Sequence, residues 1–145
     1  MTEEYDQELE NELMEVAFGE VTETSREIFQ KLGREYVDGE VLFHEGDEGS
    51  CLYIILSGTV AITKKGENGS FIELAHLKQG EILGEMSHFD ELPRSATATA
   101  CGVTQVLVFS RANFSLIFQL HPKWTTKLVA GLSQRISNSI KELDC

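Results

Sequence analysis

A glycine, an acid, an arginine and a serine lie close together in the segment from residue 82 to residue 97. Gly84 precedes a stretch expected to make about one helical turn, and the unpaired backbone N–H groups of such a turn bind anions. Arg94 adds a fixed positive charge with the forked donors that suit a phosphate, and the adjoining Ser95 adds a hydroxyl. This segment therefore predicts an anion site, and a phosphate is the expected anion.

Glu85 brings a carboxylate next to this predicted anion site. A carboxylate repels a bare phosphate, but it accepts hydrogen bonds from hydroxyl groups. Ala96, Ala98 and Ala100 are small enough for a flat ring to lie along the strand that follows. Together these residues indicate a ligand that carries a hydroxyl beside its phosphate, as a ribose phosphate does.

Short strands separated by glycine turns are expected on both sides of this segment. The β-rich runs are spaced by about 8–12 residues, as in a sandwich or a barrel. They are Tyr36–Val37, Val41–Phe43, Leu52–Leu56, Thr59–Ile62, Phe71–Leu74, Ser95–Ala100 and Gln105–Phe109. Turns are expected at residues 45–49, at Ser57 and Gly58, and at residues 66–69. No helical pattern alternates with these runs, which argues against a doubly wound parallel sheet.

Two helices are expected before the strands. In residues 5–18 apolar side chains recur at helical spacing among glutamates, so this segment is expected to be an amphipathic helix that packs on the domain. A second, short helix is expected to begin at a capping box formed by Thr24 and Glu27 and to end at Gly33.

A helical pattern returns after the strands, and Pro122 is well placed as the first residue of a long helix. Its apolar stripe consists of Leu128, Leu132, Ile136, Ile140 and Leu143. The stripe is longer than a small barrel needs for cover, so its far end is expected to meet a ligand or another chain. The expected fold class is mainly β: an antiparallel β-roll or double-stranded β-helix jelly roll with N-terminal helices and a long C-terminal helix.

The charge of the chain is unevenly distributed. Its 145 residues carry 24 acids and 12 bases, a net charge of −12, and nine of the acids but none of the bases lie in residues 1–23. The sequence therefore divides into an acidic amphipathic arm, 1–23, and one near-neutral domain, 24–145. Neither part offers the basic face that binds nucleic acid or anionic lipid, so direct binding to nucleic acid or to a membrane is not expected.

The cysteines and the first residues indicate a cytoplasmic protein. Cys51, Cys101 and Cys145 are odd in number and far apart, which is typical of reduced thiols. The N-terminus lacks the basic and apolar regions of a signal peptide, and no run reaches the ~18 apolar residues of a membrane helix.

Two spaced motifs resemble those of the cyclic nucleotide-binding domain family, of the catabolite-activator and protein-kinase regulatory-subunit type. The first motif comprises Gly46-Asp47, Gly49, the run Leu52 to Ile55, and Gly58. The second comprises Leu83 to Ser87 and Arg94 to Ala100, and it is similar to the family's phosphate-binding cassette. The resemblance covers about residues 33–143, which is all but the acidic arm.

The resemblance implies roles for the matching residues. Glu85 would accept a hydrogen bond from the ribose 2′-hydroxyl, and Arg94 would neutralise the cyclic phosphate. Ser139, on the long last helix, falls where bacterial activators place a hydroxyl that contacts the base. The expected ligand-binding residues are Gly84, Glu85, Met86, Arg94, Ser95, Ala96 and Ser139. Arg94→Ala is expected to abolish nucleotide binding while leaving the domain folded.

Two residues depart from the family's pattern. Phe43 stands where the first motif usually has a small β-branched residue, which we interpret as a change in packing. His88 stands where the cassette normally has an aliphatic residue, which bears on how its helix packs or which ligand fits.

The function that the resemblance implies is that of a regulatory sensor, not an enzyme, which binds a cyclic nucleotide and needs no cofactor. Cyclic AMP is expected before cyclic GMP because bacterial relatives mostly use it, although Ser95 does not exclude cyclic GMP. A ligand that is capped by the last helix would favour one position of that helix over the others. The effector protein is unknown, and the last helix is open to two interpretations, as part of the core or as the seam of a homodimer.

Three alternatives stay open at this point. In the first alternative, the cassette is vestigial and the domain is a non-binding interaction module. The second is a metal-dependent enzyme of the cupin type, but His44, His76, His88 and His121 show no metal-binding spacing. The third is a transcription factor, for which the chain leaves no room for a helix-turn-helix before Cys145.

Overall fold

The structure is a computed structural model that describes residues 2–84 and 92–120, so that residues 1, 85–91 and 121–145 lie outside the description. Two helices come first, α1 (Thr2–Phe18) and α2 (Glu23–Leu32). The strands that follow are β1 (Gly33–Tyr36), β2 (Val41–Phe43), β3 (Leu52–Lys65), β4 (Phe71–Leu77), β5 (Ile82–Leu83) and β6 (Thr97–Phe109). A short 3-10 helix, η1 (Phe114–Gln119), follows β6.

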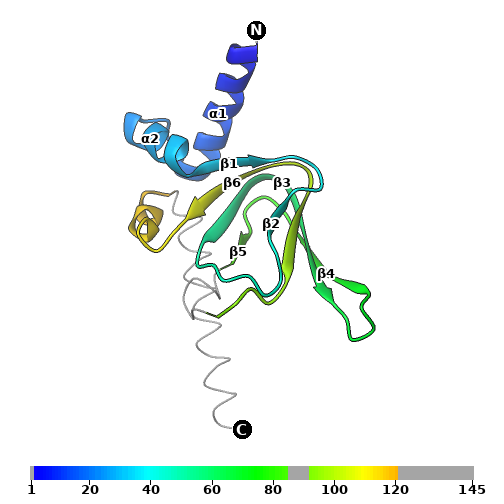
Figure 1. The fold of residues 1–145 in the computed structure, drawn as a ribbon. Coiled ribbons are helices and arrows are strands. Elements are labelled where there is room, and N and C mark those ends of the chain that lie inside the picture. The colour runs from blue at the N-terminus through cyan, green and yellow to red at the C-terminus, as the bar shows by residue number, and fades with distance from the viewer. Residues whose placement is uncertain (1, 85–91, 121–145) are drawn as a thin grey trace.

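The strands form one antiparallel sheet. The order is β1-β6-β3-β4, with β2 paired to β6 and β5 paired to β3. In Figure 1 the helices lie beside one end of the long strands, and the β3–β4 hairpin projects away from them. The prediction of a mainly antiparallel β fold with N-terminal helices is confirmed. The expected long C-terminal helix lies outside the described residues.

In two places a pair of predicted strands forms one continuous strand, namely β3 and β6. A turn was expected at Gly58, but β3 continues through it, and the pairing with β6 shifts register on both sides of Ser57. Gly58 has φ +89°, and a Cβ there would lie 2.6 Å from the carbonyl oxygen of Val103. A glycine of this kind marks a bulge in a strand as readily as a turn, because the backbone conformation is the same at this residue. The predicted turn is therefore wrong.

The first half of β3 is buried on both faces. Leu52, Ile54 and Leu56 join a cluster with residues of α1, α2 and η1. Tyr53 and Ile55 point the other way and join a second cluster on the opposite face of the sheet. Side chains alternate along a strand, so one continuous apolar run can serve two layers. Full burial of each such side chain contributes about 1.5–3 kcal/mol to stability.

The acidic helix α1 packs on the sheet by one stripe. Leu13, Met14 and Ala17 are buried, while the side chains of Glu12 and Glu15 are exposed. This is the arrangement that the amphipathic pattern predicts.

The division of the chain at residue 23 stays a prediction. Neither of the described α-helices combines the length and the apolar character needed to cross a membrane.

The second helix begins earlier than predicted. Its N-cap is Thr22, whose Oγ1 accepts from the amide of Ser25 at 3.1 Å, while the Ser25 hydroxyl accepts from the Thr22 amide at 2.7 Å. The predicted box of Thr24 and Glu27 has the same three-residue spacing. It is nevertheless wrong, because the box that forms lies two residues upstream and has Ser25 as the partner of the N-cap.

Thr22→Ala is expected to lower the free energy of unfolding by about 1 kcal/mol, because an amide of the first helical turn loses its acceptor. Thr24→Ala is the matched control, since Thr24 is an exposed residue inside the helix, and its effect should stay within about 0.5 kcal/mol. Urea unfolding of both variants measures the difference. Equal losses at the two positions would contradict the assigned N-cap.

Candidate functional site

The structure describes four of the seven predicted ligand-binding residues. Gly84 directly follows β5, and Arg94, Ser95 and Ala96 directly precede β6. Glu85, Met86 and Ser139 lie outside the described residues, as does His88, so their predicted roles stay predictions.

The two sequence motifs meet in space at Arg94. The amide of Arg94 donates to the carbonyl of Asp47 at 2.9 Å, and its carbonyl accepts from the amide of Gly46 at 2.8 Å. Gly46 and Asp47 belong to the turn after β2, 47 residues and more before Arg94 in the chain. These paired backbone bonds fix where the Arg94 side chain starts and direct it into the fold.

The Arg94 guanidinium is buried, with only 4% of the residue exposed. Its Nη2 donates to the carbonyl of Cys51 at 2.7 Å and its Nη1 donates to the carbonyl of Gly84 at 3.2 Å. Burying a cation is costly unless polar groups surround it, and these carbonyl dipoles supply part of that stabilisation. Arg94 therefore joins Cys51, the residue before β3, to Gly84 of the predicted cassette.

Gly84 fits this arrangement because it has no side chain. Its φ is +83°, and a Cβ there would lie 2.6 Å from Arg94 Nη1 and 2.7 Å from the Cys51 carbonyl oxygen. Strand β5 brings it to this place by pairing Leu83 with Tyr53 of β3. Gly84 and Arg94, which were selected from the sequence as parts of one anion site, are thus in direct contact.

Aromatic rings complete the surroundings of the guanidinium. The Cζ atom of Arg94 lies 4.2 Å from the ring centroid of Phe43 and 5.9 Å from that of Tyr53. The two rings lie 5.7 Å apart and are tilted by 42°. Sequence reasoning did not assign these residues to the site. The one signal in the sequence that pointed to Phe43 was its departure from the family's first motif. We had interpreted that departure as a change in packing alone.

The two remaining described candidates, Ser95 and Ala96, differ in exposure. Ser95 is exposed, so its hydroxyl is open to solvent. Ala96 is buried, and so are Ala98 and Ala100 farther along β6. The alanines were expected to leave room for a flat ring, whereas here all three have little or no surface open to solvent. The proposed role of Ala96 in ligand binding stays a prediction.

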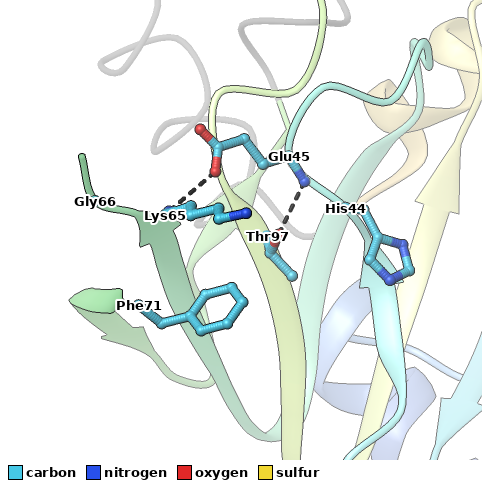
Figure 2. A pocket seen from close by; sticks show the side chains of 6 residues that line it. All are labelled: His44, Glu45, Lys65, Gly66, Phe71 and Thr97. Atoms are coloured by element: carbon cyan, nitrogen blue, oxygen red, sulfur yellow. Dashed lines mark hydrogen bonds between the residues drawn. The ribbon is translucent and has the colours of Figure 1, made fainter. Parts of the chain in front are cut away.

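A pocket with a volume of about 500 Å³ is lined by His44, Glu45, Lys65, Gly66, Phe71 and Thr97. Figure 2 shows Glu45 linked to two strands, since its carboxylate accepts from the amide of Lys65 at 3.1 Å and its own amide donates to the Thr97 hydroxyl at 2.9 Å. None of Gly84, Arg94, Ser95 and Ala96, the four candidates that the structure describes, lines this pocket. His44 and Thr97 of its lining are the chain neighbours of Phe43 and Ala96.

The described histidines pair with nearby acids. His44 Nδ1 lies 3.7 Å from an Asp47 oxygen, and His76 contacts the Glu73 carboxylate. Across residues 2–84 and 92–120, no three His, Cys, Asp or Glu side chains gather as metal ligands would.

Burial raises the pKa of Tyr53 to about 12, and the neighbouring Tyr36 and Cys51 add to the rise while Arg94 opposes it. The folded state therefore holds the phenolic proton more tightly than the unfolded chain, whose value is 10.0. Stability that depends on this proton is complete below the unfolded pKa and falls as the pH rises toward the folded one.

We expect the free energy of unfolding to fall between pH 10 and pH 12, and Tyr53→Phe to reduce that fall. Urea unfolding across this range gives the free energies. The ultraviolet absorbance of phenolate, followed in folded and urea-unfolded protein, reports the ionisation itself. A Tyr53 that ionises together with the tyrosines of the unfolded chain would contradict the burial assigned to it.

The comparisons with known proteins agree with this fold. The family model of the cyclic nucleotide-binding domain matches residues 33–121, which is more than half of the chain. The chain therefore belongs to the cyclic nucleotide-binding domain family.

Two curated relatives show the range of proteins that carry such a region. The chain is 36% identical over 111 residues to the cyclic AMP receptor protein of Thermus thermophilus, a match that covers 77% of this chain and 51% of that protein. It is 35% identical over 98 residues to lysophospholipase NTE1 of Chaetomium globosum, which covers 68% of this chain and 6% of that protein. The chain thus spans about half or less of the length of these relatives, and the relatives include an enzyme.

Solved structures show the same architecture. The crystal structure of the Thermus thermophilus catabolite activator protein is similar with a TM-score of 0.63 and 32% identity, over 91% of this chain and 62% of that one. The cAMP-bound form of the EAL enzyme Bd1971 is similar with a TM-score of 0.55 and 27% identity, over 77% of this chain and 30% of that one. That enzyme has also been solved in a cGMP-bound form.

Proposed function

We propose that this chain binds a cyclic purine nucleotide, cyclic AMP in preference to cyclic GMP, and acts as a non-catalytic regulatory sensor in the cytoplasm. The observation that carries the proposal is the contact between Gly84 and Arg94. It joins the two halves of the predicted phosphate-binding segment in a chain of the cyclic nucleotide-binding family. A cyclic AMP receptor protein among the relatives and a cAMP-bound structure of similar fold support the choice of ligand.

The Arg94 charge is the group that recognises the phosphate in this proposal. It is held in a region of low polarity, where the attraction between a cation and an anion is stronger than in water. Its guanidinium is planar and suits two phosphate oxygens at once. Glu85 accepts from the ribose 2′-hydroxyl, and Met86, Ser95 and Ala96 complete the ligand's surroundings, as the sequence predicts.

The parts outside the described residues keep the roles that the sequence predicts for them. Ser139 on the long last helix contacts the base, and the sheet closes into a jelly roll beneath it. Ligand binding favours one position of that helix, which is how the signal leaves the domain. A homodimer through the apolar stripe is part of the same proposal, and residues 1–23 act as an arm on a domain formed by residues 24–145.

One observation favours a second candidate, a non-binding interaction module of the same fold. The Arg94 guanidinium donates to two backbone carbonyls and is 4% exposed, so a purely structural role would also account for the arginine. In that case the cassette is vestigial and the domain serves only to bind other proteins.

Isothermal titration of the purified chain with cyclic AMP, cyclic GMP and 5′-AMP separates the two candidates. We expect saturable one-to-one binding of cyclic AMP, weaker binding of cyclic GMP and little heat with 5′-AMP, whose phosphate is not a cyclic diester. A rise in the melting temperature with cyclic AMP concentration should accompany binding, since a ligand that binds only the folded state stabilises it. No heat and no rise with either cyclic nucleotide would favour the non-binding module.

A further inference from the structure

We propose that Phe43 is a positioning residue for Arg94, so that the affinity for the phosphate of a cyclic nucleotide depends on an aromatic side chain at position 43. This inference rests on the proposed function. It replaces our interpretation of Phe43 as a change in packing alone.

The geometry places the guanidinium against the Phe43 ring. The 4.2 Å from Arg94 Cζ to the ring centroid is well inside the ~6 Å over which a cation is attracted to an aromatic face. Tyr53, at 5.9 Å, lies at the limit of that range and contributes less. Of the two described rings near the charge, that of Phe43 is therefore the nearer partner.

The burial of Arg94 makes this contact stronger than one on the surface. A cation over a ring gains most when both are withdrawn from water, and Arg94 is 4% exposed while Phe43 is half-buried. The carbonyls of Cys51 and Gly84 hold the two Nη atoms, and the ring contacts the Cζ atom. Two edge contacts and one face contact define the orientation of a planar group.

The local backbone explains how Phe43 reaches this position. Strand β2 pairs with β6 at Val41 and Thr99 and again at Phe43 and Ala98, so the register shifts between the two pairs. An irregularity of this kind re-aims the side chain that follows it. Strand β2 thereby delivers a large ring to the guanidinium that precedes β6.

The expected consequence is a loss of phosphate affinity that does not depend on the base. A long arginine side chain has many rotamers, and fixing one of them on binding costs conformational entropy. A ring that already holds the binding orientation removes that cost from the binding free energy. Phe43→Leu keeps an apolar side chain of similar size but has no aromatic face. We expect it to weaken binding of cyclic AMP and cyclic GMP by the same factor, about tenfold. Phe43→Tyr restores the face and should bind within about twofold of the wild type.

Titration calorimetry of the wild type, Phe43→Leu and Phe43→Tyr with both nucleotides measures these affinities. A second readout follows the contact itself, namely the NMR resonance of the Arg94 Nε–Hε group, assigned by its loss in Arg94→Lys. The ring current of Phe43 shifts this resonance, so it should move in Phe43→Leu and not in Phe43→Tyr. Phe43→Met serves in place of Phe43→Leu if the leucine variant does not fold.

The outcomes distinguish this inference from the proposed function. If the wild type binds nucleotide and the Phe43→Leu variant binds it with equal affinity, the inference is overturned and the proposed function stands. A loss for one nucleotide only also overturns it, because the ring would then contact the base. A wild type that binds neither nucleotide overturns the proposed function, and an Arg94 resonance unmoved in Phe43→Leu would then overturn the positioning contact as well.

Discussion

Arg94→Ala is expected to abolish detectable binding of cyclic AMP and to lower the free energy of unfolding by about 3 kcal/mol. The first effect follows from the proposed phosphate contact, since removal of one partner of a buried charge pair costs about 2–5 kcal/mol of binding, or at least about thirtyfold in affinity. The second follows from the two carbonyls, Cys51 and Gly84, which lose a charged donor and are left buried. The sequence-based expectation that this variant stays folded remains a prediction, and the structure adds the expected loss of stability.

Arg94→Lys separates the two effects. Lysine keeps the positive charge and can donate to one of the carbonyls, but it has no planar fork for two phosphate oxygens. We expect a folded protein with about a hundredfold weaker binding, measured by titration calorimetry beside urea unfolding. A folded lysine variant that binds cyclic AMP as tightly as the wild type would show that the guanidinium does not recognise the phosphate.

Gly84→Ala is expected to lower the free energy of unfolding by about 3 kcal/mol or more. The positive φ costs an alanine about 1–2 kcal/mol. The new Cβ would also lie 2.7 Å from the backbone carbonyl oxygen of Cys51, and crowding of this kind in a packed region adds about 1–3 kcal/mol. Because the same Cβ meets Arg94 Nη1, the variant should lose nucleotide binding even under conditions where it folds.

Gly69→Ala is the matched control for this prediction. Its φ of +81° is close to that of Gly84, but nothing lies within 4 Å of the Cβ that it would gain. We therefore expect only the conformational cost, about 1–2 kcal/mol, and unchanged nucleotide affinity. Urea unfolding and titration calorimetry of both variants provide the test. If the two alanines cost the same, the close approach of Cys51 and Arg94 to Gly84 is not real.

The sequence predicted the contact between Gly84 and Arg94 because the two residues belong to one local segment. Their types and placement indicate an anion site, and the nine residues between them are few enough for the chain to return. The meeting of Arg94 with Gly46 and Asp47 was not predicted, because the resemblance assigned both motifs to one family without indicating that they touch. Spacing along the chain could not have given it, because it depends on pairing between residues 47 or more apart.

Other features could not be predicted because they depend on tertiary contacts. A glycine such as Gly58 permits a turn and a bulge equally, and only the neighbouring strand β6 decides between them. The helix α2 is capped by Thr22 with Ser25, whereas the usual capping pattern, with Glu or Gln at the third position, favoured Thr24 with Glu27. The role of Phe43 requires knowledge of where a guanidinium far along the chain is placed, which no local pattern contains.

The two-sided burial of β3 has a consequence for how far the candidate site lies from the helices. Tyr53 faces Arg94, while its neighbours Leu52 and Ile54 support α1 and α2. Only the thickness of one polypeptide backbone separates the two layers. A displacement of β3 at Tyr53 would therefore also displace Leu52 and Ile54, on which the N-terminal helices pack.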